Sequence, residues 1–299
     1  MSAPHSPGNP PPAETRIDAA LAGALVRAQH PDLAHLTIEP AASGWDNAMF
    51  RLGDALALRL PRRAMAAALI RIEQHWLPRV APELPLPVPT PVRIGTPGEG
   101  YPFVWSITPW LAGAPADRAP PEAGSGVALA AFLTALHTPA PADAPFNRFR
   151  GVPLVERAAG FEDRLAALAP RGFALAPAMR RLWDAAVAAP IDAPKVWTHG
   201  DLHGRNVLTQ GGAIAAVIDW GDMSASDPAV DLAAAWMLLP DVRERVAAME
   251  AYGGSETTWT RARGWALLMA VLVGVGDINA DPRMAAMGAA ILARLAEGP

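Results

Sequence analysis

Two short polar segments carry the residues with the most specific chemistry in this chain. Residues 199–206 read HGDLHGRN, and a second acidic segment, IDWGD, begins at Ile218. Short apolar runs flank both segments, and a tight turn at residues 210–212 separates them. Apolar runs joined by a glycine turn are typical of a β-hairpin. Such a hairpin would bring Asp201, Asn206 and Asp219 together at one edge of a sheet.

Two carboxylates and an amide oxygen in one place point to a metal that prefers oxygen ligands. Mg²⁺ is such a metal, and it commonly shares its ligands with phosphate oxygens and water. Phosphoryl transfer also needs a carboxylate that orients the attacking hydroxyl and accepts its proton. The order Asp, four residues, Asn, then Asp-x-Gly after a strand matches the kinase pattern H-R-D-x-x-x-x-N and D-F-G. We therefore predict that Asp201 is the catalytic base and that Asn206 and Asp219 hold the metal.

The same segments resemble a known family. HGDLHGRN followed by AVIDWGDMSASDPAVDLAAAW is similar to the aminoglycoside phosphotransferase family of kinase-like small-molecule phosphotransferases. Upstream, SGWDNAMFRLGDALALRLPRR resembles the family's phosphate loop, turn and nucleotide-binding strand, and LIRIEQHWLP resembles the helix that supplies an acidic partner. The resemblance covers most of residues 40–265 and is most specific in residues 197–236. It implies ATP or GTP as donor, Mg²⁺ as cofactor and a hydroxyl on a small molecule as acceptor.

Further roles follow from the resemblance, residue by residue. His199 and Asp231 are expected to brace the catalytic loop. The nucleotide-binding positions are Ser43, Gly44, Asn47, Arg59, Glu73, Pro109 and Leu111.

Several of these positions depart from the family's pattern. Arg59 stands where the family often has a lysine, and its guanidinium would grip phosphate through a planar fork, with Glu73 as its ion-pair partner. The phosphate loop has a single glycine, so binding would rest on the Gly44 backbone and the side chains of Ser43 and Asn47. These departures keep open the alternative of a nucleotide-binding module without catalysis.

The charge distribution predicts the acceptor. The net charge is -4, which argues against a nucleic-acid partner, whose binding surface should be basic. The excess of negative charge lies after Lys195, where 12 acidic residues face 7 arginines, so we expect a cationic acceptor such as an aminoglycoside. An endogenous metabolite, a macrolide, an amino alcohol or a sugar remain alternatives, because a fold does not fix its substrate. The predicted acceptor-binding residues are Asp222, Glu256, Asp277 and Asp281.

The hydrophobic pattern predicts the organisation that would position these residues. We expect a Pro-rich disordered tail over residues 1–13, a nucleotide-binding lobe with a small sheet over 14–110, and a mainly helical catalytic and acceptor-binding lobe over 111–299. The stretch VWSITPWLAG between the lobes resembles the family's adenine-binding hinge. This resemblance implies a hinge near residues 108–114 that binds adenine through the Pro109 carbonyl and the Leu111 amide. The predicted fold is therefore α+β, two-lobed and protein-kinase-like.

Composition excludes other classes of function. The chain has no cysteine, which excludes disulfides and thiolate chemistry. Its longest apolar stretch is too short to span a bilayer, and its start lacks a signal-peptide pattern, so we expect a cytoplasmic protein without a membrane partner. The pattern His199-x-Asp201-x-His203 also fits a zinc site, but no second group of histidines follows it. Composition does not determine the oligomeric state.

Overall fold

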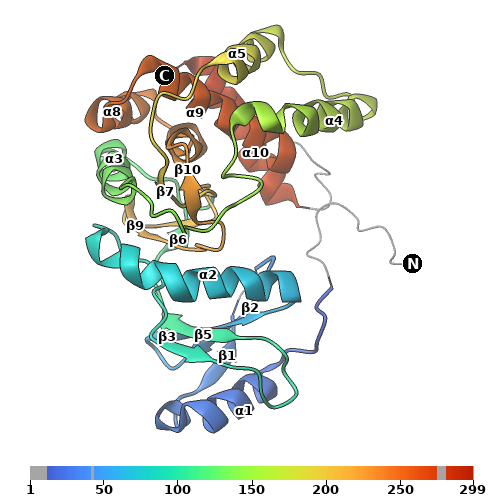
Figure 1. Cartoon of the computed structure of the whole chain (residues 1–299), viewed down its shortest axis with the longest axis vertical. Helices are drawn as coiled ribbons and strands as arrows, with labels where there is room; N and C mark the ends of the chain where they lie inside the picture. Colours follow the sequence, from blue (N-terminus) through green and yellow to red (C-terminus); the bar gives the residue numbers. More distant parts are fainter. Residues whose placement is uncertain (1–11, 42–43, 275–280, 299) are drawn as a thin grey trace.

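The chain folds into two lobes, a small sheet lobe and a larger helical lobe (Figure 1). A computed structural model describes residues 12–41, 44–274 and 281–298. The predicted tail lies almost entirely outside these residues. The antiparallel sheet of one lobe and the helices of the other confirm the α+β, two-lobed organisation expected from the sequence.

The small lobe is built on a five-stranded antiparallel sheet with the order β1-β2-β3-β5-β4. Helices α1 (Ala19–Gln29) and α2 (Ala64–Val80) lie on opposite sides of it (Figure 1). The predicted hairpin is present, and its turn places Gly53 at φ +57, a conformation that favours glycine. The strands are β1 (Ile38–Pro40), β2 (Asn47–Leu52), β3 (Leu56–Pro61), β4 (Arg93–Gly95) and β5 (Trp105–Pro109).

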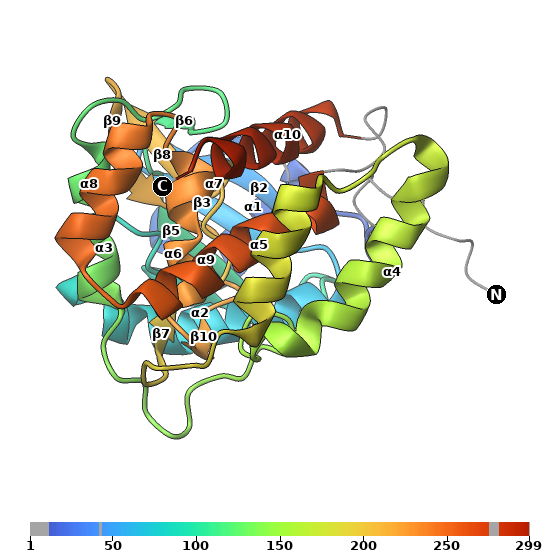
Figure 2. The same cartoon turned by 90° about the horizontal axis from the view of Figure 1, so that it is seen from above.

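The larger lobe contains most of the helices. Figure 2 shows α3 and α8 on one side, α4 and α5 on the other, and α9 between them. The predicted helix over residues 229–239 is split into α6 and α7, and α9 continues as a π-helical turn over Ala270–Gly274. The helices are α3 (Ser125–Leu136), α4 (Ala158–Leu168), α5 (Pro177–Ala188), α6 (Ala229–Leu232), α7 (Ala234–Leu238), α8 (Val242–Tyr252), α9 (Glu256–Met269) and α10 (Pro282–Glu297).

Two small sheets support the polar segments. Strands β8 (Val207–Gln210) and β9 (Ala213–Val217) form the predicted hairpin, and β6 (Ala114–Pro115) pairs with its outer edge. The strand that precedes the catalytic loop, β7 (Val196–Thr198), pairs instead with β10 (Ser224–Ser226). The loop after β7 is therefore held by the segment that follows the second acidic motif.

The core of the large lobe lies directly beneath these small sheets. It is a continuous apolar cluster in which Trp220 and Trp236 are fully buried, and it extends through α9. No helix among the described residues is long and apolar enough to cross a membrane. The packed helices therefore form a rigid base for the loops that carry the polar residues.

Candidate active site

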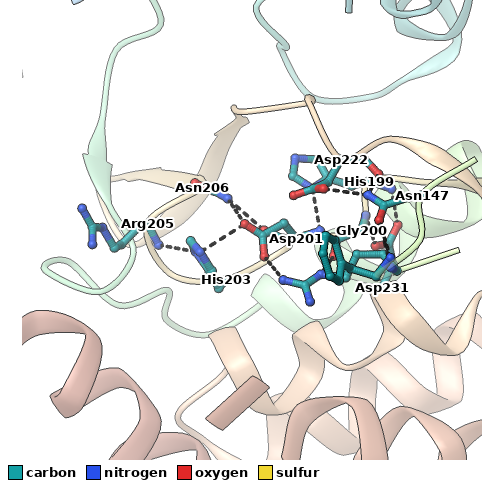
Figure 3. Close-up of polar contacts among 11 residues, drawn as sticks. Asn147, His199, Gly200, Asp201, His203, Arg205, Asn206, Asp222 and Asp231 are labelled. Atoms are coloured by element: carbon teal, nitrogen blue, oxygen red, sulfur yellow. Dashed lines mark hydrogen bonds and ion pairs between the residues drawn. The ribbon is translucent and has the colours of Figure 1, made fainter. Parts of the chain in front are cut away.

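Asp201 lies at the centre of the polar cluster, in the loop after β7 (Figure 3). Its Oδ2 accepts a hydrogen bond of 3.0 Å from Asn206 Nδ2 and lies 3.3 Å from His203 Nε2. Its Oδ1 accepts a hydrogen bond of 3.1 Å from Arg150 Nη2. Hydrogen bonds to both oxygens therefore fix the orientation of the carboxylate. Asp201 is also partly exposed, so a substrate can reach it.

Electrostatics favour the ionised form of Asp201. Burial would raise the pKa of its carboxyl, but the positive charges of His203 and Arg150 outweigh that effect and hold the pKa below its usual range. For Asp222 the balance is opposite. Burial and the negative charge of Asp201 raise its pKa, against the opposing charge of Arg150. The pKa of Asp201 is therefore lowered, whereas the pKa of the neighbouring Asp222 is raised. Perturbed pKa values of this kind are common in catalytic sites.

Asp231 fixes the backbone of the catalytic loop. Its Oδ2 accepts a hydrogen bond of 2.6 Å from the His199 amide, and its Oδ1 accepts one of 2.8 Å from the Gly200 amide. The side chain is fully buried. Gly200 has φ +85, and a Cβ there would lie 2.9 Å from the Asp222 carbonyl oxygen, so this position requires glycine. Figure 3 shows Asp231 below the loop that carries Asp201.

The ring of His199 is fully occupied by backbone contacts. Its Nδ1 accepts a hydrogen bond from the Asp201 amide, and its Nε2 donates to the Ile218 carbonyl at 3.0 Å. Neither nitrogen is left for a metal, so the zinc alternative does not fit this geometry. His199 instead ties the catalytic loop to the residue that precedes Asp219.

Asn206 and Asp219 offer the oxygens that a divalent metal would need. Both hydrogen bonds of the Asn206 side chain use its nitrogen, one to the Asp201 carbonyl and one to its carboxylate. The side-chain oxygen of Asn206, Oδ1, therefore remains available for a ligand. Asp219 has φ +64, an uncommon conformation for a residue other than glycine, and its side chain is 55% exposed. This oxygen-only donor set fits Mg²⁺.

The small lobe contributes a buried ion pair next to Asp219. Arg59 in β3 and Glu73 in α2 form a two-pronged salt bridge, in which Arg59 Nη2 donates to Glu73 Oε1 at 2.9 Å. The same Nη2 lies 3.7 Å from Asp219 Oδ1. Arg59 thus connects the predicted metal ligand of the large lobe to the helix of the small lobe.

The predicted phosphate loop lies beside the start of β2. The Gly44 amide donates to the Asn47 carbonyl at 3.0 Å, and Asn47 Oδ1 is buried without a hydrogen-bond partner among the described residues. Sequence reasoning missed Asp46, which pairs with Arg63 at 2.8 Å. Burial and the negative charge of Asp219 raise the pKa of Asp46. Ser43 lies outside the described residues.

The predicted hinge positions occur where β5 leaves the small lobe. Pro109 is the last residue of β5 and pairs with Leu56. Leu111 follows as a partly buried residue in the connection to the large lobe. Both residues lie in the connection between the lobes.

Arg150 and Asn147 are the main site residues that sequence reasoning missed. Besides its contact with Asp201, Arg150 donates through Nε to the Gly200 carbonyl at 3.0 Å. Asn147 donates to Asp222 Oδ1 at 2.6 Å and accepts from the Arg150 amide. Both residues come from the loop between α3 and α4, which has no recognisable motif. The only signal was a concentration of arginine and phenylalanine at residues 146–150.

Of the predicted acceptor-binding acids that the structure describes, Asp222, Glu256 and Asp281, only Asp222 lies in the cluster. Glu256 is an exposed residue of α9, next to the cap residue Ser255, which bonds Asp192. Asp192 pairs with Arg261, which also binds Asp227. Strands β7 and β10 are antiparallel, so Asp227, which follows β10, lies near the start of β7. Asp201 follows the opposite end of β7. Glu256 therefore lies outside the cluster around Asp201, and its predicted acceptor role stays a prediction.

Asp281 is occupied by structural contacts. It caps α10 by accepting from the amides of Arg283 and Met284, and it forms a 2.8 Å ion pair with Arg205 of the catalytic loop. Arg283 in turn binds Asp117 at 2.7 Å, and the Asp117 amide donates to the Gly204 carbonyl at 3.0 Å. Asp281 therefore anchors α10 to the catalytic loop. These contacts differ from the acceptor-binding role that the sequence predicts. Asp277 lies outside the described residues.

Comparisons with known proteins agree with this geometry. A family model described as the phosphotransferase enzyme family matches residues 37–265. The chain therefore belongs to this family, and the resemblance found in the sequence is confirmed. It is an enzyme of the phosphotransferase class. A search of curated proteins found no match.

Solved structures share the fold at low sequence identity. The GDP and kanamycin complex of APH(2")-IIia has a TM-score of 0.70 and 18% identity, covering 93% of this chain and 99% of that one. Macrolide 2'-phosphotransferase MphH from Brachybacterium faecium has a TM-score of 0.59 and 23% identity, with coverage of 91% and 97%. An ADP-bound APH(2'')-Ib has a TM-score of 0.59 and 13% identity, with coverage of 93% and 98%. At these identities the likeness shows the fold alone.

Proposed function

We propose that this enzyme transfers the γ-phosphoryl group of ATP or GTP to a hydroxyl group of a small molecule in the cytoplasm. The observation that carries the proposal is the contact of Asp201 with Asn206, at 3.0 Å, beside Asp219 and the Arg59–Glu73 pair. Phosphoryl transfer depends mainly on positioning and charge stabilisation, and this arrangement supplies both. The nucleotide complexes of structurally similar enzymes support a nucleotide donor.

Each side chain has a defined task in this proposal. The ionised Asp201 orients the acceptor hydroxyl and accepts its proton, and Arg150 and Asn206 hold the carboxylate in place. Arg59, fixed by Glu73, presents positive charge to the nucleotide phosphates. Pro109 and Leu111 lie where the base would bind, and the loop at Gly44 and Asn47 lies where the phosphates would bind. Asp231 and His199 hold the catalytic loop through its backbone.

Asn206 and Asp219 would hold Mg²⁺ through their side-chain oxygens. A bound Mg²⁺ neutralises phosphate charge and stabilises the charge that develops during transfer. The exposed carboxylate of Asp219 and the available side-chain oxygen of Asn206 fit this role. A nucleotide-binding module without catalysis would not need a held, ionised Asp201.

Replacing Asp219 by alanine tests the metal assignment. We expect Asp219→Ala to weaken ATP binding roughly tenfold or more when Mg²⁺ is present, since a metal ligand is lost. Without Mg²⁺ the loss should be small, because a carboxylate beside bare phosphates repels them. Titration of ATP with and without Mg²⁺ measures both values. Equal losses in the two titrations would show that Asp219 acts structurally.

The reaction itself is tested by ADP release. Purified enzyme with ATP and Mg²⁺ is assayed against aminoglycosides, macrolides, amino alcohols and sugars. We expect acceptor-dependent ADP release with at least one hydroxyl compound, and the phosphorylated product should be visible by mass spectrometry. Nucleotide binding with no transfer to any acceptor would favour a binding module instead.

A further inference from the structure

The loop between α3 and α4 places basic and aromatic side chains next to Asp201. Arg150 contacts the Asp201 carboxylate directly. Phe149 lies beside it in the sequence, and its side chain is exposed. The guanidinium carbons of Arg148 and Arg157 lie 4.6 and 5.3 Å from the centre of the Phe149 ring. We call Arg148, Phe149 and Arg157 the basic-aromatic patch.

The two arginines of this patch are not neutralised by the protein. Among the described residues, neither Arg148 nor Arg157 forms a salt bridge with a carboxylate. Arg157 Nε is buried without a hydrogen-bond partner in the described part of the chain. Burial and the nearby positive charge of Arg150 also lower the pKa of Arg157. The charged form of the Arg157 side chain is therefore disfavoured, and an anion beside it would stabilise that form.

Three carboxylates in or bound to the catalytic loop region, in contrast, already have partners. Asp201 is bound by Arg150, and Asp222 accepts a hydrogen bond from Asn147. Asp281 is held by Arg205 and by the first turn of α10. Glu156, within the loop itself, is exposed and is the carboxylate closest in sequence to the patch. A polycationic acceptor would have to compete with Arg150 for Asp201 and with Arg205 for Asp281.

We propose that the basic-aromatic patch binds the acceptor, and that the acceptor carries an anionic group, a carboxylate or a phosphate, attached to a flat ring. The ring packs against Phe149, and the anionic group pairs with the guanidinium groups of Arg148 and Arg157, while the hydroxyl reaches Asp201. Guanidinium groups suit both anions because they donate paired hydrogen bonds. This inference rests on the proposed function and replaces the cationic acceptor that the net charge suggested.

Binding of matched probes tests the charge preference. Full-length enzyme saturated with ADP and Mg²⁺ is titrated calorimetrically with 4-(hydroxymethyl)benzoate, 4-(hydroxymethyl)phenyl phosphate, benzyl alcohol and 4-(aminomethyl)benzyl alcohol. These probes share one ring and one hydroxyl and differ in charge. We expect at least one anionic probe to bind about tenfold more tightly than the neutral and cationic probes. The carboxylate and phosphate arms show which anion is preferred. Equal binding, absent binding of both anions, or a preference for the cation would overturn the proposal.

Two variants locate the binding. Arg148→Gln and Arg157→Gln should each reduce the affinity for the preferred anionic probe roughly threefold or more, with little change for benzyl alcohol. Arg181→Gln, at an exposed position of α5, is the matched control and should leave every probe unchanged. A loss for all probes alike, or an equal loss in Arg181→Gln, would show that the patch does not recognise the anion. Thermal unfolding checks that each variant is folded.

The outcomes separate this inference from the proposed function. Mg²⁺-dependent nucleotide binding and ADP release with any acceptor would support phosphoryl transfer even if the probes show no charge preference. Conversely, selective binding of the anionic probes without any ADP release would support the patch and contradict the transfer reaction.

Discussion

Asp201→Asn is expected to lower turnover by about 10²–10⁴-fold, the usual contribution of a positioned general base. Asparagine keeps the shape of the side chain and an oxygen that can accept from Arg150, but it cannot accept the proton of the acceptor. Nucleotide affinity should stay within about threefold of the unmodified enzyme, because the proposed nucleotide contacts are made by other residues. Steady-state ADP release and a nucleotide titration measure the two effects.

A matched control is available on α5. Asp184 is an exposed aspartate there, and Asp184→Asn makes the same chemical change away from the cluster. It should leave turnover unchanged. If Asp201→Asn retained more than about a tenth of the turnover, Asp201 would not be the base.

Asp231→Ala is expected to destabilise the protein by roughly 3 kcal/mol, because it removes a buried carboxylate that accepts from two backbone amides. The amides of His199 and Gly200 would be left buried without their partner. His137 Nε2, which lies 3.5 Å from Asp231, would lose the same contact. Urea unfolding without nucleotide measures the free energy of unfolding, and turnover should fall as well because the catalytic loop is no longer held.

Two further variants separate this effect from the loss of any aspartate. Asp231→Asn keeps one acceptor oxygen and should lose less stability than the alanine variant. Asp241→Ala removes the exposed cap of α8 and should cost only about 1 kcal/mol. A similar small loss for Asp231→Ala would mean that the catalytic loop does not depend on this carboxylate.

The site could be predicted from the sequence where its residues are close in the chain. Asp201 and Asn206 are five residues apart, so their contact depends mainly on one local loop. Asp219 follows the hairpin of β8 and β9, which glycine and apolar residues indicate clearly. Arg150 belongs to a distant loop without a motif, and only the packing of the whole lobe brings it to Asp201.

Net charge does not show which charges of a chain are paired with one another. The acidic last third of the chain includes Asp227, held by Arg261, and Asp281, held by Arg205. These pairs stabilise the fold and offer little free charge to a ligand. The composition of a segment therefore predicts its average charge but not the charge of a particular surface.

Secondary structure followed the sequence where the apolar pattern was strong. The apolar pattern predicts a helix over residues 64–80, and α2 has these bounds. It also predicts a hairpin of residues 48–52 and 55–60, and three of these four bounds differ by one residue from those of β2 and β3. Helix α4 was missed because it buries only Phe161 and Leu168. Strand β10 has the sequence SAS, which lacks the apolar alternation typical of a strand. The segment is a strand only because it pairs with β7.

The link between the catalytic loop and α10 has a consequence for the synthesis of the protein. Arg205 is held by Asp281, and Asp117, which contacts Gly204, is held by Arg283. During translation the loop is made long before residues 281–283 emerge from the ribosome. The nascent chain can form the small lobe and β7 early, but the catalytic loop gains these anchors only after residues 281–283 have emerged. Phosphotransferase activity should therefore arise only once α10 has been synthesised.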